Sequence, residues 1–247
     1  MWWLMLFACP RRGELDAAAE VEALLKNSDQ AWENRGSDGF DPVVSALDAA
    51  FARQPREPGV LWRLARLRVG QAFAAEDRRE ALSAFADARG HAIACLSVEP
   101  AMLQRDLATF SEAVTGLPPA EQPCLSWAAL AWAQWSIALG PEATRLDVPR
   151  IEALNEAAGD ADGRTDWTRA LLASVSDPPD YGAAGKYFVA AVSADPTDLS
   201  RRADLIAYYA LPANEREVAA QQLLFLDDKR AVTPEDRAAV QRGKRLR

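Results

Sequence analysis

Histidine and cysteine are scarce in this chain of 247 residues, which holds one histidine and three cysteines. His91 has no ligand partner nearby in the sequence, and Cys9, Cys95 and Cys124 form no CxxC pair. We therefore expect neither a zinc site nor a thiol redox site. A single histidine also leaves little room for a Ser-His-Asp or Cys-His nucleophile. Cys95 and Cys124 stand in apolar helical contexts, which predicts small core residues.

The chain also lacks the short motifs of common enzyme sites. It contains no GxxxxGK followed by Ser or Thr, no HExxH, no GxSxG and no GxGxxG. The run Asp160-Ala161-Asp162-Gly163 hints at a calcium loop, but the twelfth position of that loop is Leu171 and not Glu. These absences predict a protein that is not an enzyme and that holds no metal and no cofactor.

An excess of positive charge is missing as well, since the formal net charge is −8. Neutralising phosphates requires a basic face, so nucleic acid is not expected as a partner. The basic residues are dispersed except at the carboxyl end, where they are Arg242, Lys244, Arg245 and Arg247. This grouping predicts that residues 233–247 form a basic, solvated tail.

Val and Ile are sparse, whereas Ala, Leu, Arg and Glu are abundant. This composition favours helices and disfavours sheets, so the predicted fold class is all-α. Periodicity and the positions of Pro and Gly predict helices over 16–34, 41–53, 59–75, 77–98, 102–115, 124–139, 148–158, 164–175, 181–194, 198–210 and 213–227. From residue 234 on, we expect a short helix or a frayed end. Prolines are expected between these helices and not within them.

Three of the predicted helices end in the same way, at Pro55, Pro100 and Pro196. Positions twelve, eight and five residues before each proline lie on one face of a helix. The residues there are small or apolar: Val43, Leu47 and Ala50; Ala88, Ala92 and Cys95; Ala184, Phe188 and Ala191. This spacing is that of the second helix of a tetratricopeptide repeat (TPR), and the copy ending at Pro196 matches it best.

The first helices of the repeat follow the same logic, with matches at Trp62 and at Trp127. The predicted architecture is a TPR-like α-solenoid of antiparallel helix pairs over residues 16–232.

The predicted helix 124–139 contains no charged residue and is shorter than a membrane span. Trp127 belongs to the stripe that packs against other repeats, while Trp132 and Trp135 belong to a second stripe on a different face. We expect the second stripe, with Tyr208 and Tyr209, to line an apolar groove or an interface. Core packing within one chain, a ligand-lining role and contact with a second copy all remain open for Trp132 and Trp135.

The amino-terminal segment 1–15 is expected to be a truncated or atypical signal segment. Its run Leu6-Phe7-Ala8-Cys9 resembles a bacterial lipobox, which predicts lipidation at Cys9 and a longer signal peptide upstream. The alternative is an apolar start with no such role.

The order of these features resembles a known family. After the lipobox-like segment and the degenerate repeats come the Trp-rich helix, Pro178-Pro179-Asp180-Tyr181-Gly182, and Ala207-Tyr208-Tyr209-Ala210-Leu211-Pro212. This order over about residues 20–227 is similar to that of the TatT family, the TPR-type lipoproteins associated with bacterial TRAP transporters.

The resemblance implies a non-enzymatic, lipid-anchored periplasmic accessory of a solute transport system. Its expected partner is a periplasmic solute-binding protein, with a small apolar ligand and a second copy of the chain as further candidates. A general TPR scaffold that docks a peptide or an assembly partner is the alternative function.

Overall fold

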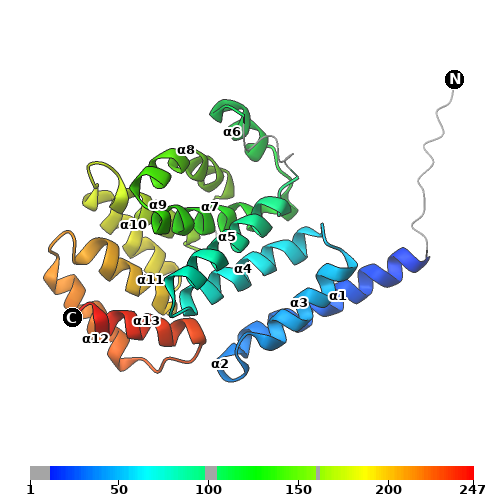
Figure 1. Ribbon diagram of the computed structural model, residues 1–247, viewed down its shortest axis with the longest axis horizontal. Helices are drawn as coiled ribbons and strands as arrows, with labels where there is room; N and C mark the ends of the chain where they lie inside the picture. Colours follow the sequence, from blue (N-terminus) through cyan, green and yellow to red (C-terminus); the bar gives the residue numbers. More distant parts are fainter. Residues whose placement is uncertain (1–11, 98–104, 160–161) are drawn as a thin grey trace.

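The computed structural model describes residues 12–97, 105–159 and 162–247, and every regular element within these ranges is helical (Figure 1). The all-α prediction is therefore confirmed. The first half of the chain forms α1 (Arg12–Glu33), α2 (Arg35–Asp38), α3 (Asp41–Arg53), α4 (Pro58–Ala74), α5 (Arg78–Cys95) and α6 (Leu107–Thr115). The second half forms η2 (Pro119–Glu121), α7 (Gln122–Leu139), α8 (Pro141–Ala158), α9 (Arg164–Val175), α10 (Tyr181–Ala194), α11 (Leu199–Asp204), η3 (Leu205–Ala210), α12 (Arg216–Asp228) and α13 (Pro234–Arg245).

Helices that follow one another in the chain pack in pairs. The strongest contacts join α1 to α3, α4 to α5, α7 to α8, and α9 to α10, while α5 also packs against α7. Figure 1 shows α7 in the interior, with α5, α8 and α9 around it. A helix without charged residues is stable in this position because apolar neighbours surround it.

The nine positions predicted from the proline-anchored spacing all belong to the core. None is more than 3% exposed, and they lie on α3, α5 and α10. The prediction of one buried face on each of these helices is therefore confirmed, and Phe188 is fully buried as expected.

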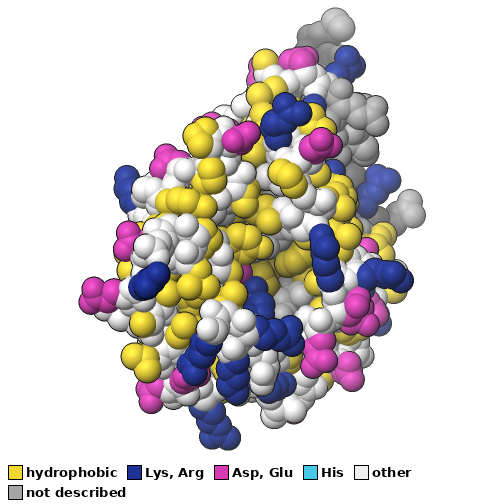
Figure 2. Space-filling model, turned by 60° about the vertical axis from the view of Figure 1, so that its left-hand side comes forward, with side chains coloured by type: hydrophobic (Ala, Val, Ile, Leu, Met, Phe, Trp, Pro, Cys, Tyr) yellow, Lys and Arg dark blue, Asp and Glu magenta, His cyan; other side chains and the backbone are white. Residues whose placement is uncertain are grey.

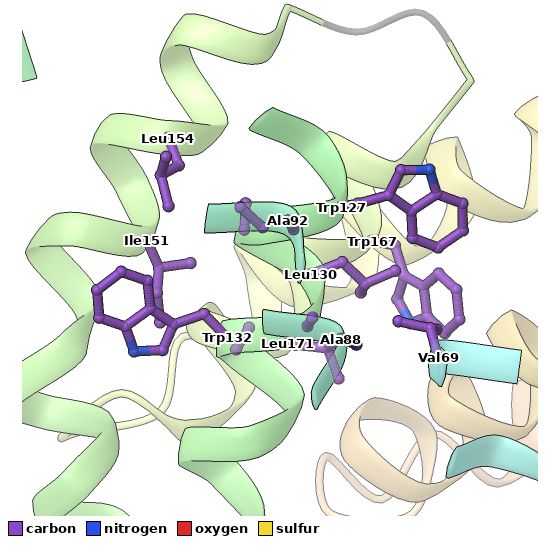
Figure 3. Packing of buried hydrophobic residues seen from close by; sticks show 14 of the residues in the cluster. Val69, Ala88, Ala92, Trp127, Leu130, Trp132, Ile151, Leu154, Trp167 and Leu171 are labelled. Carbon is purple, nitrogen blue, oxygen red and sulfur yellow. The ribbon is translucent and has the colours of Figure 1, made fainter. Parts of the chain in front are cut away.

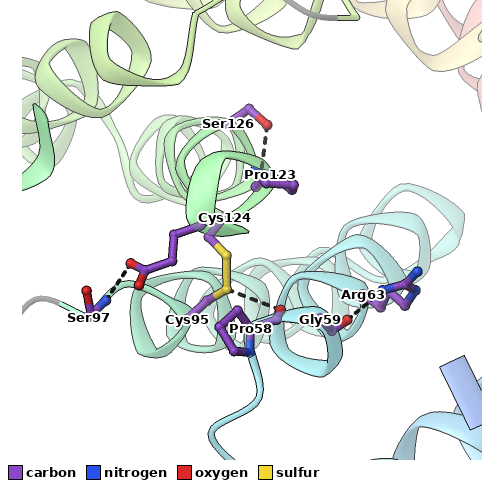
Figure 4. Close-up of a disulfide and its surroundings, with 9 residues drawn as sticks. Pro58, Gly59, Arg63, Cys95, Ser97, Pro123, Cys124 and Ser126 are labelled. Carbon is purple, nitrogen blue, oxygen red and sulfur yellow. Dashed lines mark hydrogen bonds between the residues drawn. A yellow bond between two sulfur atoms is a disulfide. The ribbon is translucent and has the colours of Figure 1, made fainter. Parts of the chain in front are cut away.

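Cys95 and Cys124 are buried, as predicted, but they are also joined by a disulfide that the sequence did not indicate (Figure 4). Their Cα atoms lie 5.9 Å apart, although 29 positions separate them in the chain. The bridge joins the last residue of α5 to the start of α7. Next to it, the Ser97 backbone N–H donates a hydrogen bond of 2.7 Å to Glu121 Oε2. The disulfide thus fixes the contact between two central helices.

The prediction that prolines lie between helices is wrong for Pro149, which lies inside α8. Helix α8 starts at Pro141, directly after Gly140 with its φ of 123°, and not near residue 148 as expected. Proline lacks a backbone N–H and removes one hydrogen bond from a helix interior. The packing of α8 against α7 and α6 compensates for this loss.

The short helix expected from residue 234 on is present as α13, but the prediction that residues 233–247 form a solvated tail is wrong for the face that packs inward. Helix α13 packs against α4 and α11, and Ala239 is fully buried. Thr233 and Asp236 form a capping box at its start, and Arg242 donates a hydrogen bond of 2.9 Å to the buried Asp204. Among the four basic residues, only Arg242 has this buried partner, which lies 38 positions earlier in the chain, whereas Lys244, Arg245 and Arg247 are exposed, as predicted.

Cys9 and the lipobox-like run lie outside the described residues, so the lipidation prediction is not tested. Residues 12–15 of the predicted signal segment belong to the helix α1. Within the described ranges, no helix combines the length and the apolar character that a membrane span requires.

Candidate functional site

Trp132 and Trp135, the tryptophans predicted to line a groove, face the interior between α5 and α8. Trp132 is 3% exposed and Trp135 is half-buried. The guanidinium of Arg89, from α5, lies 4.2 Å from the ring centroid of Trp132 and 4.5 Å from that of Trp135. Figure 3 shows Trp132 beside Ile151 of α8. Trp132 therefore packs in the core, which is one of the three roles that its sequence position left open.

Tyr208 and Tyr209 lie on η3, a π-helical segment that contacts α9 and α10. Burial, together with the nearby Asp204 carboxylate, raises the pKa of Tyr208 to about 12. Tyr209 lies flush against Gly185, where a Cβ atom would come within 2.5 Å of the tyrosine ring. Trp132, Trp135, Tyr208 and Tyr209 all belong to or pack against the same core cluster.

A cavity of about 560 Å³ opens elsewhere, where α1, α4, α7, α9, α11 and the start of α13 meet. Its volume lies within the range of small-molecule sites. Three tryptophans contribute to its walls: Trp32, Trp127 and Trp167. Four arginines also line it: Arg35, Arg66, Arg164 and Arg201. We call this space the Arg–Trp cavity.

On one wall of the Arg–Trp cavity, two arginines lie over the ring of Trp32. The guanidinium carbon of Arg35 is 4.0 Å from the ring centroid, and that of Arg66 is 4.5 Å away. Trp32 itself packs against Gly70 of α4, where a Cβ atom would approach the indole to 3.0 Å. The absence of a side chain at position 70 therefore lets the Trp32 ring lie close to α4.

On the opposite wall, Arg164 lies 4.3 Å from the ring of Trp127, and Arg201 lies 5.4 Å from the ring of Trp167. Figure 3 shows Trp127 and Trp167 near Val69, on the side of α7 away from Trp132. Gly163 directly precedes α9 in this wall. Its φ is 73°, and a Cβ atom at this position would lie 2.6 Å from the side chain of Ala194. A left-handed backbone with such close neighbours requires glycine.

Each cavity arginine has a carboxylate partner. The pairs are Arg35 with Glu235 (2.6 Å), Arg66 with Asp29 (2.8 Å), Arg164 with Asp162 (2.5 Å), and Arg201 with Asp198 (3.1 Å). The guanidinium groups also act on one another. Burial lowers the pKa of Arg164 to about 10, and the positive charges of Arg201 and Arg66 contribute to the shift. The arginines of both walls therefore share one electrostatic environment.

Three side chains in the walls of the Arg–Trp cavity are at least nine-tenths buried and have a polar atom without a hydrogen-bond partner among the described residues. They are Trp127 (8% exposed) at Nε1, Ser200 (2%) at Oγ, and Glu235 (8%) at Oε2. Arg66 Nε is in the same state. Leaving a buried donor or acceptor unpaired costs about 1–3 kcal/mol. These atoms are enclosed by neighbouring protein atoms and are not exposed at the surface of the cavity.

The side chain of Asp204 accepts a hydrogen bond from Trp167 and holds its ring in place. Its carboxylate is fully buried and accepts hydrogen bonds from Gln134 Nε2 (2.9 Å), Trp167 Nε1 (3.1 Å) and Arg242 (2.9 Å). Desolvation raises the pKa of Asp204, and the Arg242 charge opposes that change. This one side chain joins α7, α9 and α13, and so fixes the orientation of the Trp167 indole.

Lys and Arg side chains also gather at the surface, although the chain is acidic as a whole. Figure 2 shows them in the lower half of one face, which is hollowed near its middle. A second cavity of about 360 Å³ lies between the end of α4 and α13, where Arg237, Arg242 and Arg245 contribute to its lining.

The sequence prediction missed the Arg–Trp cavity, although one signal was present. Helix α4 is largely apolar, yet it carries Arg63 and Arg66, and their side chains are only 16% and 15% exposed. Asp29 of α1 accepts hydrogen bonds from both. Arginines on the buried face of a helix are rare unless they are paired, so they mark a polar site.

The described residues contain no group of His, Cys, Asp or Glu side chains arranged to hold a metal ion. The walls of the Arg–Trp cavity combine tryptophan rings with guanidinium groups that are paired to carboxylates. A scan against models of protein families finds no match, and a search of curated proteins finds no similar sequence.

Proposed function

We propose that this protein is a non-enzymatic, TPR-like binding protein of the TatT type. In this role it works in the periplasm beside the solute-binding protein of a TRAP-type transporter, and it takes up a small ligand itself. The observation that carries the ligand-binding part is the Arg–Trp cavity, whose size suits a small organic molecule.

The arrangement of the helices supports the TPR-like part of the proposal. Four pairs of neighbouring helices pack together, and three of the second helices bury the small or apolar residues that the repeat spacing demands. Such pairs stack into a curved array in repeat proteins, and the concave side binds ligands.

The disulfide between Cys95 and Cys124 supports the periplasmic location. Structural disulfides persist in oxidising compartments, of which the bacterial periplasm is one. This support is independent of Cys9, whose lipidation remains part of the proposal. With cells that carry the natural upstream region, Cys9→Ala should move the protein from the membrane fraction to the soluble periplasm. A native protein found in the soluble fraction would contradict the lipid anchor.

A general TPR scaffold that docks a peptide remains the second candidate. Arg66 favours this second candidate, because it is a basic residue on α4, which corresponds to a first helix of the repeat, and its guanidinium lines the cavity. The uncharged helix α7 favours the transport accessory, since a peptide-clamp scaffold would carry basic or amide side chains along such a helix.

The experiment that tests the proposal is a direct titration of two purified proteins. Sedimentation velocity should show a complex between this chain and the solute-binding protein encoded beside a TRAP permease in the same genome, and it should also report any self-association. A solute-binding protein of another transporter class serves as the control. If neither protein associates, the accessory function is wrong, and binding of peptides would then favour the scaffold.

A further inference from the structure

We propose that the second cavity, between the end of α4 and α13, binds a small organic anion, a carboxylate with a short apolar body. We call this space the α4–α13 cavity. Its volume of about 360 Å³ lies near the lower end of the range of small-molecule sites. Its lining shares only Phe73 with that of the Arg–Trp cavity. The inference therefore goes beyond the proposed function and can fail without affecting it.

One face of α13 forms a wall of the α4–α13 cavity. The lining residues of this helix follow the three- and four-residue spacing of a helical stripe: Pro234, Arg237, Ala238, Gln241, Arg242 and Arg245. Arg237 and Arg245 are eight positions apart, which is about 12 Å along a helix axis, and Gln241 stands halfway between them. The two arginines therefore stand toward opposite ends of this wall.

Arg237 and Arg245 keep hydrogen-bond donors that a solute can reach, because both residues are exposed. Within the described part of the chain, Arg245 forms no hydrogen bond and no ion pair. Arg237 uses only Nη1, which donates a hydrogen bond of 2.7 Å to the backbone oxygen of Val232. The N–H donors of a guanidinium form a planar fork that matches a carboxylate. Each of these arginines can thus receive the carboxylate of a ligand.

Arg242 contributes its stem to the cavity but no free donor. Its Nη1 donates to the buried Asp204, and its Nε and Nη2 are enclosed by protein atoms. The Asp204 carboxylate also balances its charge. Of the remaining charged groups, Arg237 and Arg245 exceed the single carboxylate of Glu76 by one positive charge. The cavity therefore favours an anion, although the chain as a whole is acidic.

The rest of the lining is apolar and is formed mainly by small residues. Ala74 and Ala75 lie where α4 ends, and Pro234 and Ala238 belong to α13. All four are half-buried, so part of their surface is open to the cavity. Apolar surface of this kind gains by covering an alkyl chain or a small ring. This selects a carboxylate with an apolar body over a bare inorganic anion.

The test compares four ligands. Hexanoate has the carboxylate and the apolar body, acetate has the carboxylate with hardly any body, hexanamide is the neutral analogue, and hexylammonium carries the opposite charge. Calorimetry at low salt should show hexanoate binding about threefold or more tightly than hexanamide, the size expected for contacts with exposed arginines. It should bind about tenfold more tightly than acetate, because several methylene groups leave water.

Salt separates the charged contribution from the apolar one. At about 0.5 M NaCl the preference for hexanoate over hexanamide should largely disappear, because salt screens exposed charges. The binding of hexanamide itself should persist, since it depends on the apolar part of the lining.

The double variant Arg237→Gln with Arg245→Gln tests the two arginines. It should abolish the preference for hexanoate over hexanamide, a ratio that does not depend on the amount of folded protein. Both positions are exposed, so the fold should persist. The matched control is Arg230→Gln with Lys244→Gln, which removes two exposed positive charges that do not line the cavity. The control should keep the preference.

Glu76→Gln should produce a gain of binding, which a loss of folding cannot mimic. Among the described residues that line the α4–α13 cavity, Glu76 is the only carboxylate, and it is exposed. Its removal should tighten the binding of hexanoate about twofold to threefold and leave that of hexanamide unchanged. Glu217→Gln, at the start of α12, should alter neither.

Equal binding of hexanoate and hexanamide, or tighter binding of acetate or hexylammonium, would overturn the inference, as would the absence of hexanoate binding. It would also be overturned by a preference that high salt or the double arginine variant leaves unchanged, or by a Glu76→Gln variant that binds hexanoate no better. None of these outcomes bears on the Arg–Trp cavity, because Arg237, Arg245 and Glu76 are not part of its lining.

Discussion

The ion pair between Asp204 and Arg242 offers the sharpest test of how the fold is held together. Replacing Arg242 by Met keeps the aliphatic stem but leaves the Asp204 carboxylate, which is fully buried, without its positive partner. Removing one member of a buried pair costs roughly 3–5 kcal/mol. Because Arg242 is 34% exposed and two neutral donors stay on Asp204, we place the loss at the lower end, at about 3 kcal/mol.

The loss should depend on pH in a defined direction. Burial raises the pKa of Asp204, so the folded state binds its proton more tightly than the unfolded state does. A raised carboxyl pKa contributes a penalty that grows as the pH rises from the unfolded value toward the folded one, and that vanishes on acidification. Arg242→Met removes the charge that opposed the shift, so its deficit should be large at pH 7.5 and smaller at pH 4.5.

Urea denaturation followed by circular dichroism measures this loss, with the parent protein at each pH as the reference. Arg245→Met changes an exposed arginine on the same helix and should alter the free energy of unfolding by less than about 0.5 kcal/mol. The double variant Asp204→Asn with Arg242→Met should lose less than Arg242→Met alone, because it leaves no buried charge. A loss below about 1 kcal/mol, or an equal loss at both pH values, would refute the assignment.

Three further outcomes are expected. Phe188→Ala should lower the free energy of unfolding by about 3–5 kcal/mol, since the side chain is fully buried. Val189 is 57% exposed, so Val189→Ala should cost little, and equal losses for the two variants in urea titrations would contradict this packing. Reducing the disulfide should cost about 3.6 kcal/mol by the chain-entropy model for a loop of about 30 residues. A variant with alanine at Cys95 and Cys124 should not respond to reductant, and a parent protein that is equally insensitive to reductant would argue against the bridge. Burial and the nearby Arg68 lower the pKa of His91, so its NMR titration should have a midpoint below 6.5. The free energy of unfolding should therefore fall as the pH drops below 6.5, and His91→Gln should lose this part of the acid sensitivity. A midpoint above 6.5 would refute this expectation.

The buried faces of the helices were predictable because their pattern is local. Residues four positions apart lie on one face of a helix whatever surrounds it, so the positions of Leu47, Ala92 and Phe188 indicated burial from spacing alone. The boundaries of α3, α9 and α10 were predictable for the same reason, since Pro42, Gly163 and Asp180 stand at the starts of these three helices.

The Arg–Trp cavity was not predictable in this way. Trp32, Trp127 and Trp167 come from three helices that meet only in the folded chain, and no spacing rule joins them. Helix α7 shows the difficulty most clearly. Its two tryptophan stripes are both uncharged, so periodicity could not tell which one packs in the core. The structure buries both Trp127 and Trp132 in the core, and Trp127 also contributes to the lining of the Arg–Trp cavity.

The contact between α13 and α4 has a consequence for how such a chain can change during evolution. In an open repeat array each unit contacts only its neighbours, so units can be gained or lost and can unfold one at a time. Here the last helix returns to one near the start, and Arg242 ties it to the interior through Asp204. Inserting or deleting a helix pair between α4 and α13 would remove α13 from its contact with α4. The number of helix pairs is therefore fixed by closure, and the chain should unfold in a single transition.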